Sequence, residues 1–153
     1  IQETAAFRAE IDDLFTRIGL ESLTPIGDPG NAFGALRRRG LTLGVITNDS
    51  ERGAVAQVKA LGLVECFSFI AGWDSGHGRK PGPGQIEAFL KLHGMGPDEV
   101  IMVGDTLHDM HAARAAGVLA LGVTSGLIGP AAFEGHADHV LPSIMEIAGW
   151  LDG

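Results

Sequence analysis

Strand-like apolar runs alternate with helix-like segments through most of this sequence. The runs lie at 41–47, 66–72, 99–104 and 119–125, and a shorter one lies at 136–143. Helical patterns of roughly 10–15 residues separate them, at about 50–61, 83–93 and 106–117, and a closing helix is expected at 143–151. The uninterrupted apolar stretch 100–103 is typical of a strand that is buried on both faces. The sequence therefore predicts an α/β fold, a Rossmann-like three-layer arrangement with helices on both faces of a parallel sheet.

The first 40 residues carry a different pattern. Apolar residues recur there at spacings of three and four and predict one amphipathic helix that ends at Gly19: Phe7, Ile11, Leu14, Phe15 and Ile18. The stretch "LTPIGDPGN" (23–31) is rich in Pro and Gly and indicates a linker or hinge, after which a short helix is expected over 29–39. Because the chain begins at Ile1, inside the helical pattern, we expect further residues to precede it in the complete protein.

Charge and composition narrow the kinds of partner. The chain of 153 residues has 11 Lys and Arg against 19 Asp and Glu, a formal net charge of −8. Nucleic acid and anionic membrane surfaces both favour clustered basic residues, so we expect neither as the main partner. A single cysteine, Cys66, excludes a disulfide framework and a cysteine-based zinc site, and no apolar run reaches the length of a membrane span. A soluble, cytoplasmic protein is the expectation.

Two carboxylates follow the third predicted strand. Asp105 comes directly after "IMVG" and Asp109 follows one helical turn later, so both side chains can point to one place. Neighbouring carboxylates repel each other unless a cation lies between them, and Mg²⁺ binds through one or two carboxylates while keeping waters for a phosphate. Two alternatives stay open: either Asp105 or Thr106 caps the helix and Asp109 is solvated, or His108 joins the two acids in a transition-metal site.

Polar residues also follow the first and second predicted strands. Thr47 and Asn48 precede a helix N-terminus, which suits a phosphate oxygen, although an ordinary capping turn is the alternative. Lys80 is a compact positive charge beside Pro81 and Pro83, which stiffen its loop, although a solvated lysine is the alternative. The glycines of this loop match neither a P-loop nor the dinucleotide-binding pattern. All these groups fall at the carboxyl edge of the predicted sheet, where ligands bind.

Three stretches, "LGVITND", "GRKPGP" and "MVGDTLHDMHAARAAGV", resemble motifs two, three and four of the haloacid dehalogenase-like (HAD) hydrolases, in the family order. The nearest resemblance is to small-molecule phosphatases of the phosphoglycolate phosphatase type. It implies that Thr47, with Asn48 beside it, hydrogen-bonds the transferring phosphoryl group. It implies that Lys80 pairs with that group and with the nucleophile. It further implies that Asp105 ligates Mg²⁺ and that Asp109 ligates it directly or through water.

The same resemblance implies a division of the chain into cap, hinge and core, and it shows that the family's first motif is absent from these residues. It implies that residues 1–22 are the C-terminal part of a helical cap, 23–28 the hinge and 29–153 the HAD-like α/β core. The family's first motif, a strand that ends in an aspartate nucleophile, has no counterpart here, because "EIDDLF" (10–15) lies inside the amphipathic helix. In the family that strand lies between those at 41–47 and 99–104. Without it we expect a slot roughly twice the strand spacing of about 4.8 Å, with both edges unpaired.

Together these patterns predict a Mg²⁺-dependent phosphatase that hydrolyses a small phosphorylated metabolite through an aspartyl-phosphate intermediate. Its nucleophile is expected upstream of Ile1, its substrate is a small-molecule phosphate ester, and phosphoglycolate is taken from the resemblance alone. The chain by itself is predicted to be inactive, because it lacks the nucleophile. A non-catalytic binding module is the alternative. A 2-haloacid dehalogenase is disfavoured, since that branch usually carries Ser-Asn where this chain has Gly104 and Asp105.

Overall fold

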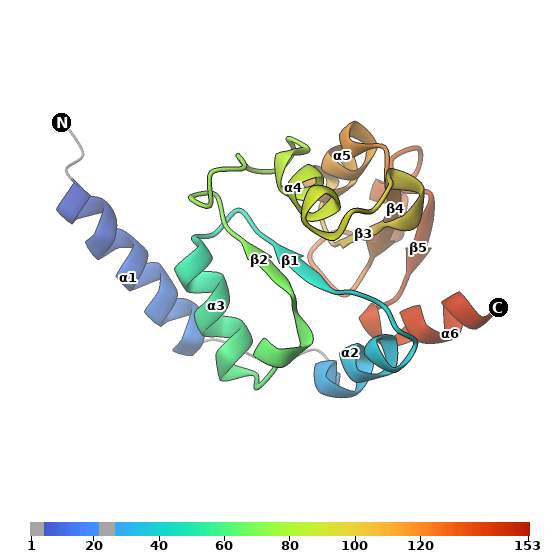
Figure 1. Cartoon of the computed structure of the whole chain (residues 1–153), viewed down its shortest axis with the longest axis horizontal. Coiled ribbons are helices and arrows are strands. Elements are labelled where there is room, and N and C mark those ends of the chain that lie inside the picture. The colour runs from blue at the N-terminus through green and yellow to red at the C-terminus, as the bar shows by residue number, and fades with distance from the viewer. Residues whose placement is uncertain (1–4, 22–26) are drawn as a thin grey trace.

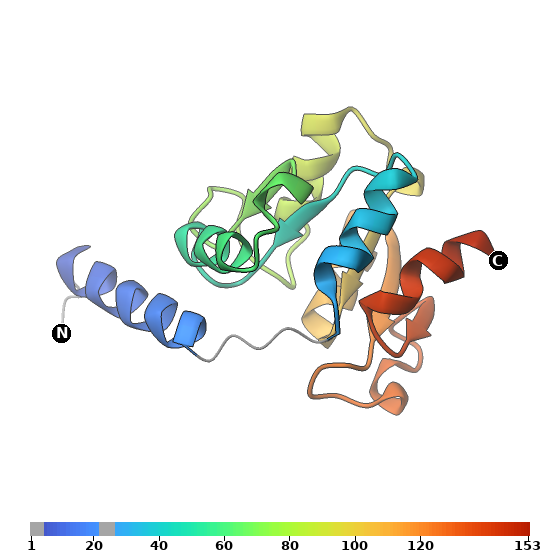
Figure 2. The ribbon, with the colours of Figure 1, turned by 90° about the horizontal axis from the view of Figure 1, so that it is seen from below.

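Parallel strands form the middle of the molecule (Figure 1). The computed structural model describes residues 5–21 and 27–153. The strands are β1 (Gly44–Ile46), β2 (Phe69–Ala71), β3 (Ile101–Gly104), β4 (Leu119–Val123) and β5 (His139–Leu141). At one end of the molecule α1 (Ala5–Glu21) packs against α3 (Glu51–Ala60), and the C-terminal helix α6 (Ile147–Asp152) lies at the other end (Figure 2).

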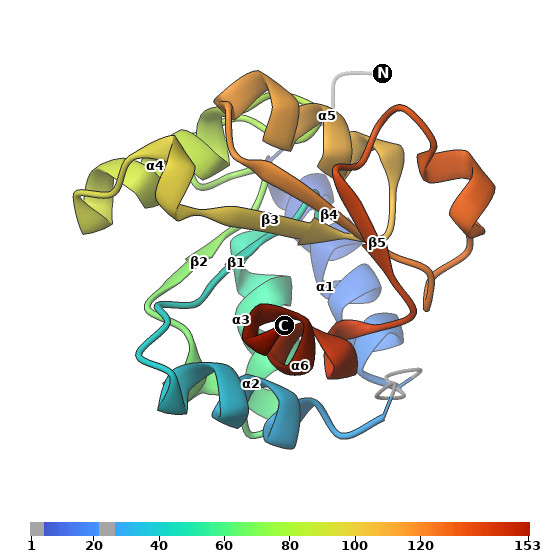
Figure 3. The same ribbon diagram turned by 90° about the vertical axis from the view of Figure 1, so that its right-hand side faces the viewer.

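Helices cover both faces of the strands. Figure 3 shows α4 (Gly84–His93) and α5 (Leu107–Ala116) on one side of β3, β4 and β5, and α2 (Pro29–Arg38) and α6 on the other. Four alternations of strand and helix along the chain therefore produce three layers, because each crossover between parallel strands places its helix over a face of the sheet. The predicted α/β class and the parallel sheet are confirmed.

Local sequence signals set the helix ends. The Ser50 hydroxyl accepts a hydrogen bond from the Gly53 N–H at 3.1 Å and caps α3. Gly94 and Gly117 follow α4 and α5 in the left-handed region, with φ of 63° and 75°, a conformation that favours glycine. The predicted helices are therefore present, with ends shifted by one to a few residues.

The first two predicted strands are shorter in the structure than in the sequence-based prediction. Residues Val64–Cys66 form a 3₁₀ helix, closed by a 2.9 Å hydrogen bond from the Cys66 N–H to the Leu63 carbonyl, where the apolar pattern had suggested the start of a strand. The prediction that Cys66 opens a buried strand is therefore wrong. A strand also needs a neighbour to pair with, and β1 pairs with β2 over only three residues.

Two apolar clusters hold the layers together. On the α5 side, Met110, Ala112 and Ala113 are fully buried, because small residues on this face let the helix lie close to the sheet. On the opposite side, Leu36 of α2 and Ile147 of α6 pack with Leu121 of β4. The core thus lies mainly around β4, the strand that is paired on both sides.

An ion pair adds to the contact between α2 and α6. The Arg39 side chain donates to Asp152 through Nε at 3.1 Å and through Nη2. These hydrogen bonds lower the pKa of the Asp152 carboxyl. The pair lies at the surface, so we assign it a minor part in stability.

The sheet is divided between β1 and β3. One sheet has the order β1-β2 and the other β3-β4-β5, so the facing edges of β1 and β3 have no strand partner in the described ranges. A cavity of about 450 Å³, here called the central slot, lies between them. Its wall is mostly apolar and includes Val45, Ile46, Ile101, Val103, Phe89 of α4 and Ile147 of α6. Because residues of both helix layers line it, the slot passes through the layer of strands, as expected for a sheet that lacks one central strand.

The N-terminal helix matches the amphipathic segment expected from the sequence and continues to Glu21, two residues past Gly19. Most of the hinge predicted at 23–28, residues 23–26, lies outside the described ranges, as do residues 1–4 and 22. The division into cap, hinge and core stays a prediction. Among the helices of the described residues, none has the length and the apolar composition that crossing a membrane requires.

Amide hydrogen exchange should distinguish the slot edges from the middle of the sheet. We expect amides of β4 to exchange at least about tenfold more slowly than those of β1 and β3 that face the slot, because the latter lack a ladder partner. Exchange monitored by NMR measures this, with the amides of α5 as a protected control. Equal protection of all three strands would contradict an open slot.

Candidate functional site

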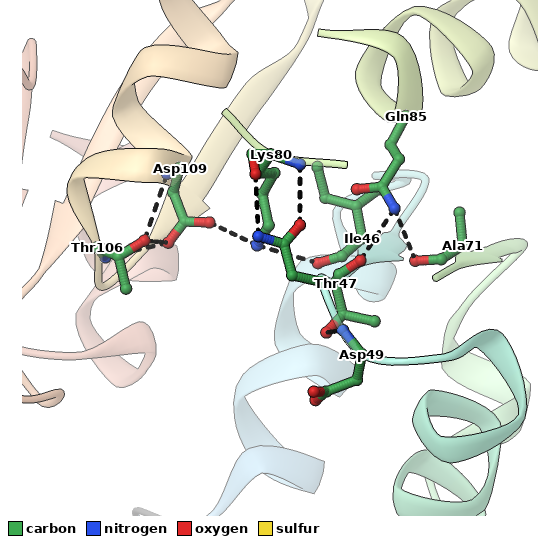
Figure 4. A network of polar contacts seen from close by, with 9 residues as sticks. Ile46, Thr47, Asp49, Ala71, Lys80, Gln85, Thr106 and Asp109 are labelled. Carbon is green, nitrogen blue, oxygen red and sulfur yellow. Dashed lines mark hydrogen bonds and ion pairs between the residues drawn. The ribbon is translucent and has the colours of Figure 1, made fainter. Parts of the chain in front are cut away.

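The Lys80 ammonium connects the two separated sheets at one end of the slot (Figure 4). Its Nζ donates to Asp109 Oδ1 at 2.5 Å and to the Ile46 carbonyl oxygen at 3.4 Å. Ile46 is the last residue of β1, and Asp109 lies in the first turn of α5, directly after β3. The Lys80 side chain is only 13% exposed, so the alternative of a solvated loop lysine is wrong. A positive charge therefore stands at the carboxyl end of the slot.

The Asn48 side chain fixes the backbone that carries Lys80. Asn48 Nδ2 donates to the Lys80 carbonyl oxygen at 3.0 Å, and Asn48 Oδ1 accepts from the Lys80 N–H at 2.8 Å. Both polar atoms of this amide are thus bonded to one residue of the loop between β2 and α4. The resemblance implied that Asn48 lies beside the phosphoryl group. In the structure its contacts position Lys80.

Asp109 is a buried partner in the cap of α5. It is 2% exposed, and its Oδ2 accepts from the Thr106 N–H at 3.0 Å and from the Thr106 hydroxyl at 2.9 Å. The Thr106 Oγ1 in turn accepts from the Asp109 N–H at 3.4 Å, which completes a capping box. Thr106 therefore caps the helix, as one alternative held, but Asp109 is not solvated. A Cβ at Gly104 would lie 2.2 Å from the Asp109 Cβ, so this close approach requires glycine.

Asp105 is the exposed carboxylate of the pair. It makes no hydrogen bond or ion pair with any residue that the structure describes, whereas both oxygens of Asp109 are bonded. Gly126, in the loop after β4, lies directly against it, because an added Cβ there would stand 2.3 Å from Asp105 Oδ2. Asp105 is thus the acid that is free to bind a cation, and a single carboxylate with waters is a normal Mg²⁺ ligand set.

The other alternative, a transition-metal site with His108, finds no support in the described residues. Within the described ranges no three His, Cys, Asp or Glu side chains gather closely enough to hold a metal ion. A transition ion there would have a single imidazole beside Asp105, because the Asp109 oxygens are already bonded to Lys80 and Thr106, whereas Mg²⁺ keeps most of its waters. The donor set at Asp105 therefore fits a hard, hydrated cation.

Thr47 has a hydroxyl proton that remains free to donate. Its Oγ1 accepts from the Asp49 N–H at 3.0 Å, and a hydroxyl can donate its own proton at the same time. The Thr47 carbonyl accepts from Gln85 Nε2 at 2.9 Å, and the same nitrogen reaches the Ala71 carbonyl at 3.5 Å. Gln85 thus joins the ends of β1 and β2 (Figure 4).

Gln85 and Gly126 were missed in the sequence. Gln85 is fully buried, and its Oε1 has no partner in the described part of the chain. No sequence pattern distinguishes a buried glutamine in the first turn of a helix from a glutamine that is exposed to solvent. Gly126 belongs to a turn-like stretch, and only the approach of Asp105 shows why glycine stands there.

A double-mutant cycle should measure the coupling of Lys80 and Asp109. Lys80→Met leaves the buried Asp109 carboxylate with one donor fewer, so we expect it to lower the free energy of unfolding by about 1–3 kcal/mol. With Asp109→Asn in addition, the loss should be smaller than the sum of the single losses. Urea denaturation measures these changes, and Lys91→Met, at an exposed position of α4, is the matched control. Additive losses would contradict a direct interaction.

Known proteins are similar to this chain in sequence. A family model described as haloacid dehalogenase-like hydrolase matches residues 3–123. The phosphoglycolate phosphatase of Neisseria meningitidis is 42% identical over 91 residues, which cover 60% of this chain and 39% of that protein. The phosphoglycolate phosphatase of Shigella boydii is 28% identical over 125 residues, which cover 82% of this chain and 50% of that protein.

A solved structure agrees over a longer range. The crystal structure of a HAD phosphatase from Thermococcus onnurineus matches with a TM-score of 0.78 and 26% identity, covering 94% of this chain and 65% of that one. The chain thus spans half or less of the length of the two phosphoglycolate phosphatases. The match to the family model includes β1 to β4 and the residues Thr47, Lys80 and Asp105. The chain therefore belongs to the haloacid dehalogenase-like hydrolase family.

Proposed function

We propose that the complete protein is a Mg²⁺-dependent phosphatase that hydrolyses a small phosphorylated metabolite. The observation that carries this proposal is the Lys80 ammonium, which is held at the carboxyl end of the central slot between β1 and α5. A buried cation at the edge of a parallel sheet, beside a free hydroxyl and an unpaired carboxylate, suits a phosphoryl dianion. The names of the two bacterial relatives make phosphoglycolate the first substrate to test.

The proposal requires a strand that carries the nucleophile, upstream of residue 1. The central slot supports it, because the slot lies between two unpaired parallel edges and is lined mainly by apolar side chains. A strand seated there would pair with β1 on one side and β3 on the other, and it would satisfy backbone groups that otherwise lack partners. Its carboxyl end would come to Lys80, whose charge would keep an aspartate side chain ionised.

Each residue of the site has one proposed task. The aspartate of the added strand would attack phosphorus as the ester oxygen leaves, and water would then hydrolyse the aspartyl phosphate. The Thr47 hydroxyl would donate to a phosphoryl oxygen, and Lys80 Nζ would balance the charge of the attacking carboxylate and of the phosphoryl group. Asp105 would hold the cation, with Asp109 beside it directly or through water. Mg²⁺, when bound, would neutralise charge on the phosphoryl oxygens.

A non-catalytic binding module is the second candidate. These 153 residues offer a site for an anion at Lys80 without an Asp-x-Asp strand end like that of the family's first motif, so binding without turnover is what they would support by themselves. Both candidates share an anion site at Lys80 and a cytoplasmic location, which the single cysteine and the acidic composition favour. Only the phosphatase would hydrolyse a phosphate ester, whereas the binding module would bind it without hydrolysis.

Supplying the strand should separate the two candidates. We expect the chain alone to be inactive, and the longer protein that includes its upstream sequence to release phosphate from phosphoglycolate or from another small phosphate ester. Phosphate release in the presence of Mg²⁺ is the measurement, and halide release from a 2-haloacid is the control for dehalogenase activity. Absence of turnover on a broad panel of phosphate esters, with the strand in place, would favour the binding module.

Substitution of Asp105 in the longer protein tests the metal assignment. We expect Asp105→Asn to lower kcat by about 10²–10³, because one charge that holds the cation is removed. The protein should keep its circular dichroism spectrum, since Asp105 is exposed and makes no contact that the fold needs. Asp98→Asn, at an exposed position before β3, is the matched control. Unchanged Mg²⁺ dependence in Asp105→Asn would rule this residue out as a ligand.

A further inference from the structure

Two imidazoles from distant parts of the sequence meet outside the site described above. His111 lies on α5, and His136 lies between η3 (Pro130–Phe133) and β5. His111 Nε2 and His136 Nδ1 are 3.3 Å apart, and the ring centroids are 5.3 Å apart. The two residues are 25 positions apart, so no short histidine motif in the sequence predicts that they meet. Neither contacts Thr47, Lys80 or the proposed Mg²⁺ ligands in any interaction of the described residues.

The segment that carries His136 is held in place against α5. Arg114 Nη2 donates to the His136 carbonyl oxygen at 3.1 Å and to that of Gly135 at 3.4 Å. The His136 N–H donates to the carbonyl of Phe133, whose side chain is 1% exposed. The approach of the two rings is therefore set by an anchored segment. A pair of ligands fixed in advance loses little conformational entropy when a ligand binds.

Both distances agree with two ligands of one tetrahedral ion. With Zn–N bonds of about 2.0–2.1 Å, two nitrogens on tetrahedral zinc lie about 3.3 Å apart and their ring centroids about 5.2 Å apart. A linear N–H···N hydrogen bond with the observed nitrogen separation would instead place the centroids about 5.6 Å apart. Hydrogen bonds bend to about 150° at little cost, so the observed spacing serves the hydrogen bond of the free protein and also suits a shared ion without movement of the segment.

We propose that His111 and His136 form a binding site for Zn²⁺ or a similar divalent transition ion. Imidazole nitrogens suit such ions, and the exposure of His111 leaves room for waters to complete the coordination. In the present contact one nitrogen carries the shared proton. On binding, that ring would move its N–H to its other nitrogen, so no proton leaves the protein.

The bound ion would join α5 to the segment before β5. Arg114 lies near the site and its charge opposes the ion, although this guanidinium is bonded to two carbonyl oxygens. With two protein ligands and this nearby charge, binding should be weaker than at a structural zinc site, which has four. The proposal does not depend on the phosphatase assignment, because it uses none of the same residues.

Isothermal titration of the chain with zinc chloride, in excess Mg²⁺, tests the proposal. We expect one Zn²⁺ per chain, and at least a tenfold weaker affinity in His111→Ala and in His136→Ala. His108→Ala, one turn earlier on the same helix, should bind as the unmodified chain does. Excess Mg²⁺ competes with zinc for exposed carboxylates such as Asp105, so it limits their contribution to the titration.

The ring nitrogens give an independent measurement. Zinc should shift the ¹⁵N resonances of His111 Nε2 and His136 Nδ1 and raise the melting temperature of the unmodified chain but not of the two variants. Circular dichroism checks that both variants fold. Zinc affinity that is unchanged in both variants, that falls equally in His108→Ala, or that is not measurable in the unmodified chain would overturn the proposal.

Discussion

The contact between the Lys80 ammonium and the Asp109 carboxylate is the interaction on which the site depends. It spans the two parts of a divided sheet, since Lys80 also reaches the Ile46 carbonyl at the end of β1. A lysine that is 13% exposed must have partners, because an unpaired buried charge is costly. The surrounding residues supply that geometry: Asn48 fixes the backbone of Lys80, and the Thr106 capping box fixes Asp109.

The divided sheet and the site share one physical origin. Parallel strands end at a common edge, and the central slot runs between β1 and β3 to that edge. Lys80 reaches the carbonyl oxygen of Ile46, a residue that lines the slot, so its positive charge lies next to the carboxyl end of the slot. The exposed carboxylate of Asp105 follows β3 at the same edge of the strands. This explains how an apolar strand can be followed by two acids at one place: one acid is paired with a lysine, and the other is available to a cation.

Much of the fold was predictable because buried strands and helix ends each require particular residue types, which can be read in the sequence. Strands covered on both faces need continuous apolar residues, and helix ends need caps such as Ser50 and Gly117. The error at Cys66 came from the same rule, since an apolar run reads as a strand whether or not a neighbour pairs with it. The 3₁₀ helix Pro130–Phe133, which buries Phe133 and leads to His136, carried no periodic signal.

The sequence by itself determined the alternation of strands and helices and the carboxyl-edge placement of Thr47, Lys80 and Asp105, because both follow from local apolar pattern and strand direction. Only the tertiary structure decided how these groups are paired. Three contacts show this: Asp109 faces Lys80, Asn48 bonds the backbone of Lys80, and His111 lies against His136. In each of them the two residues are 25 or more positions apart in the sequence. Such distances are set by packing, which no local pattern encodes.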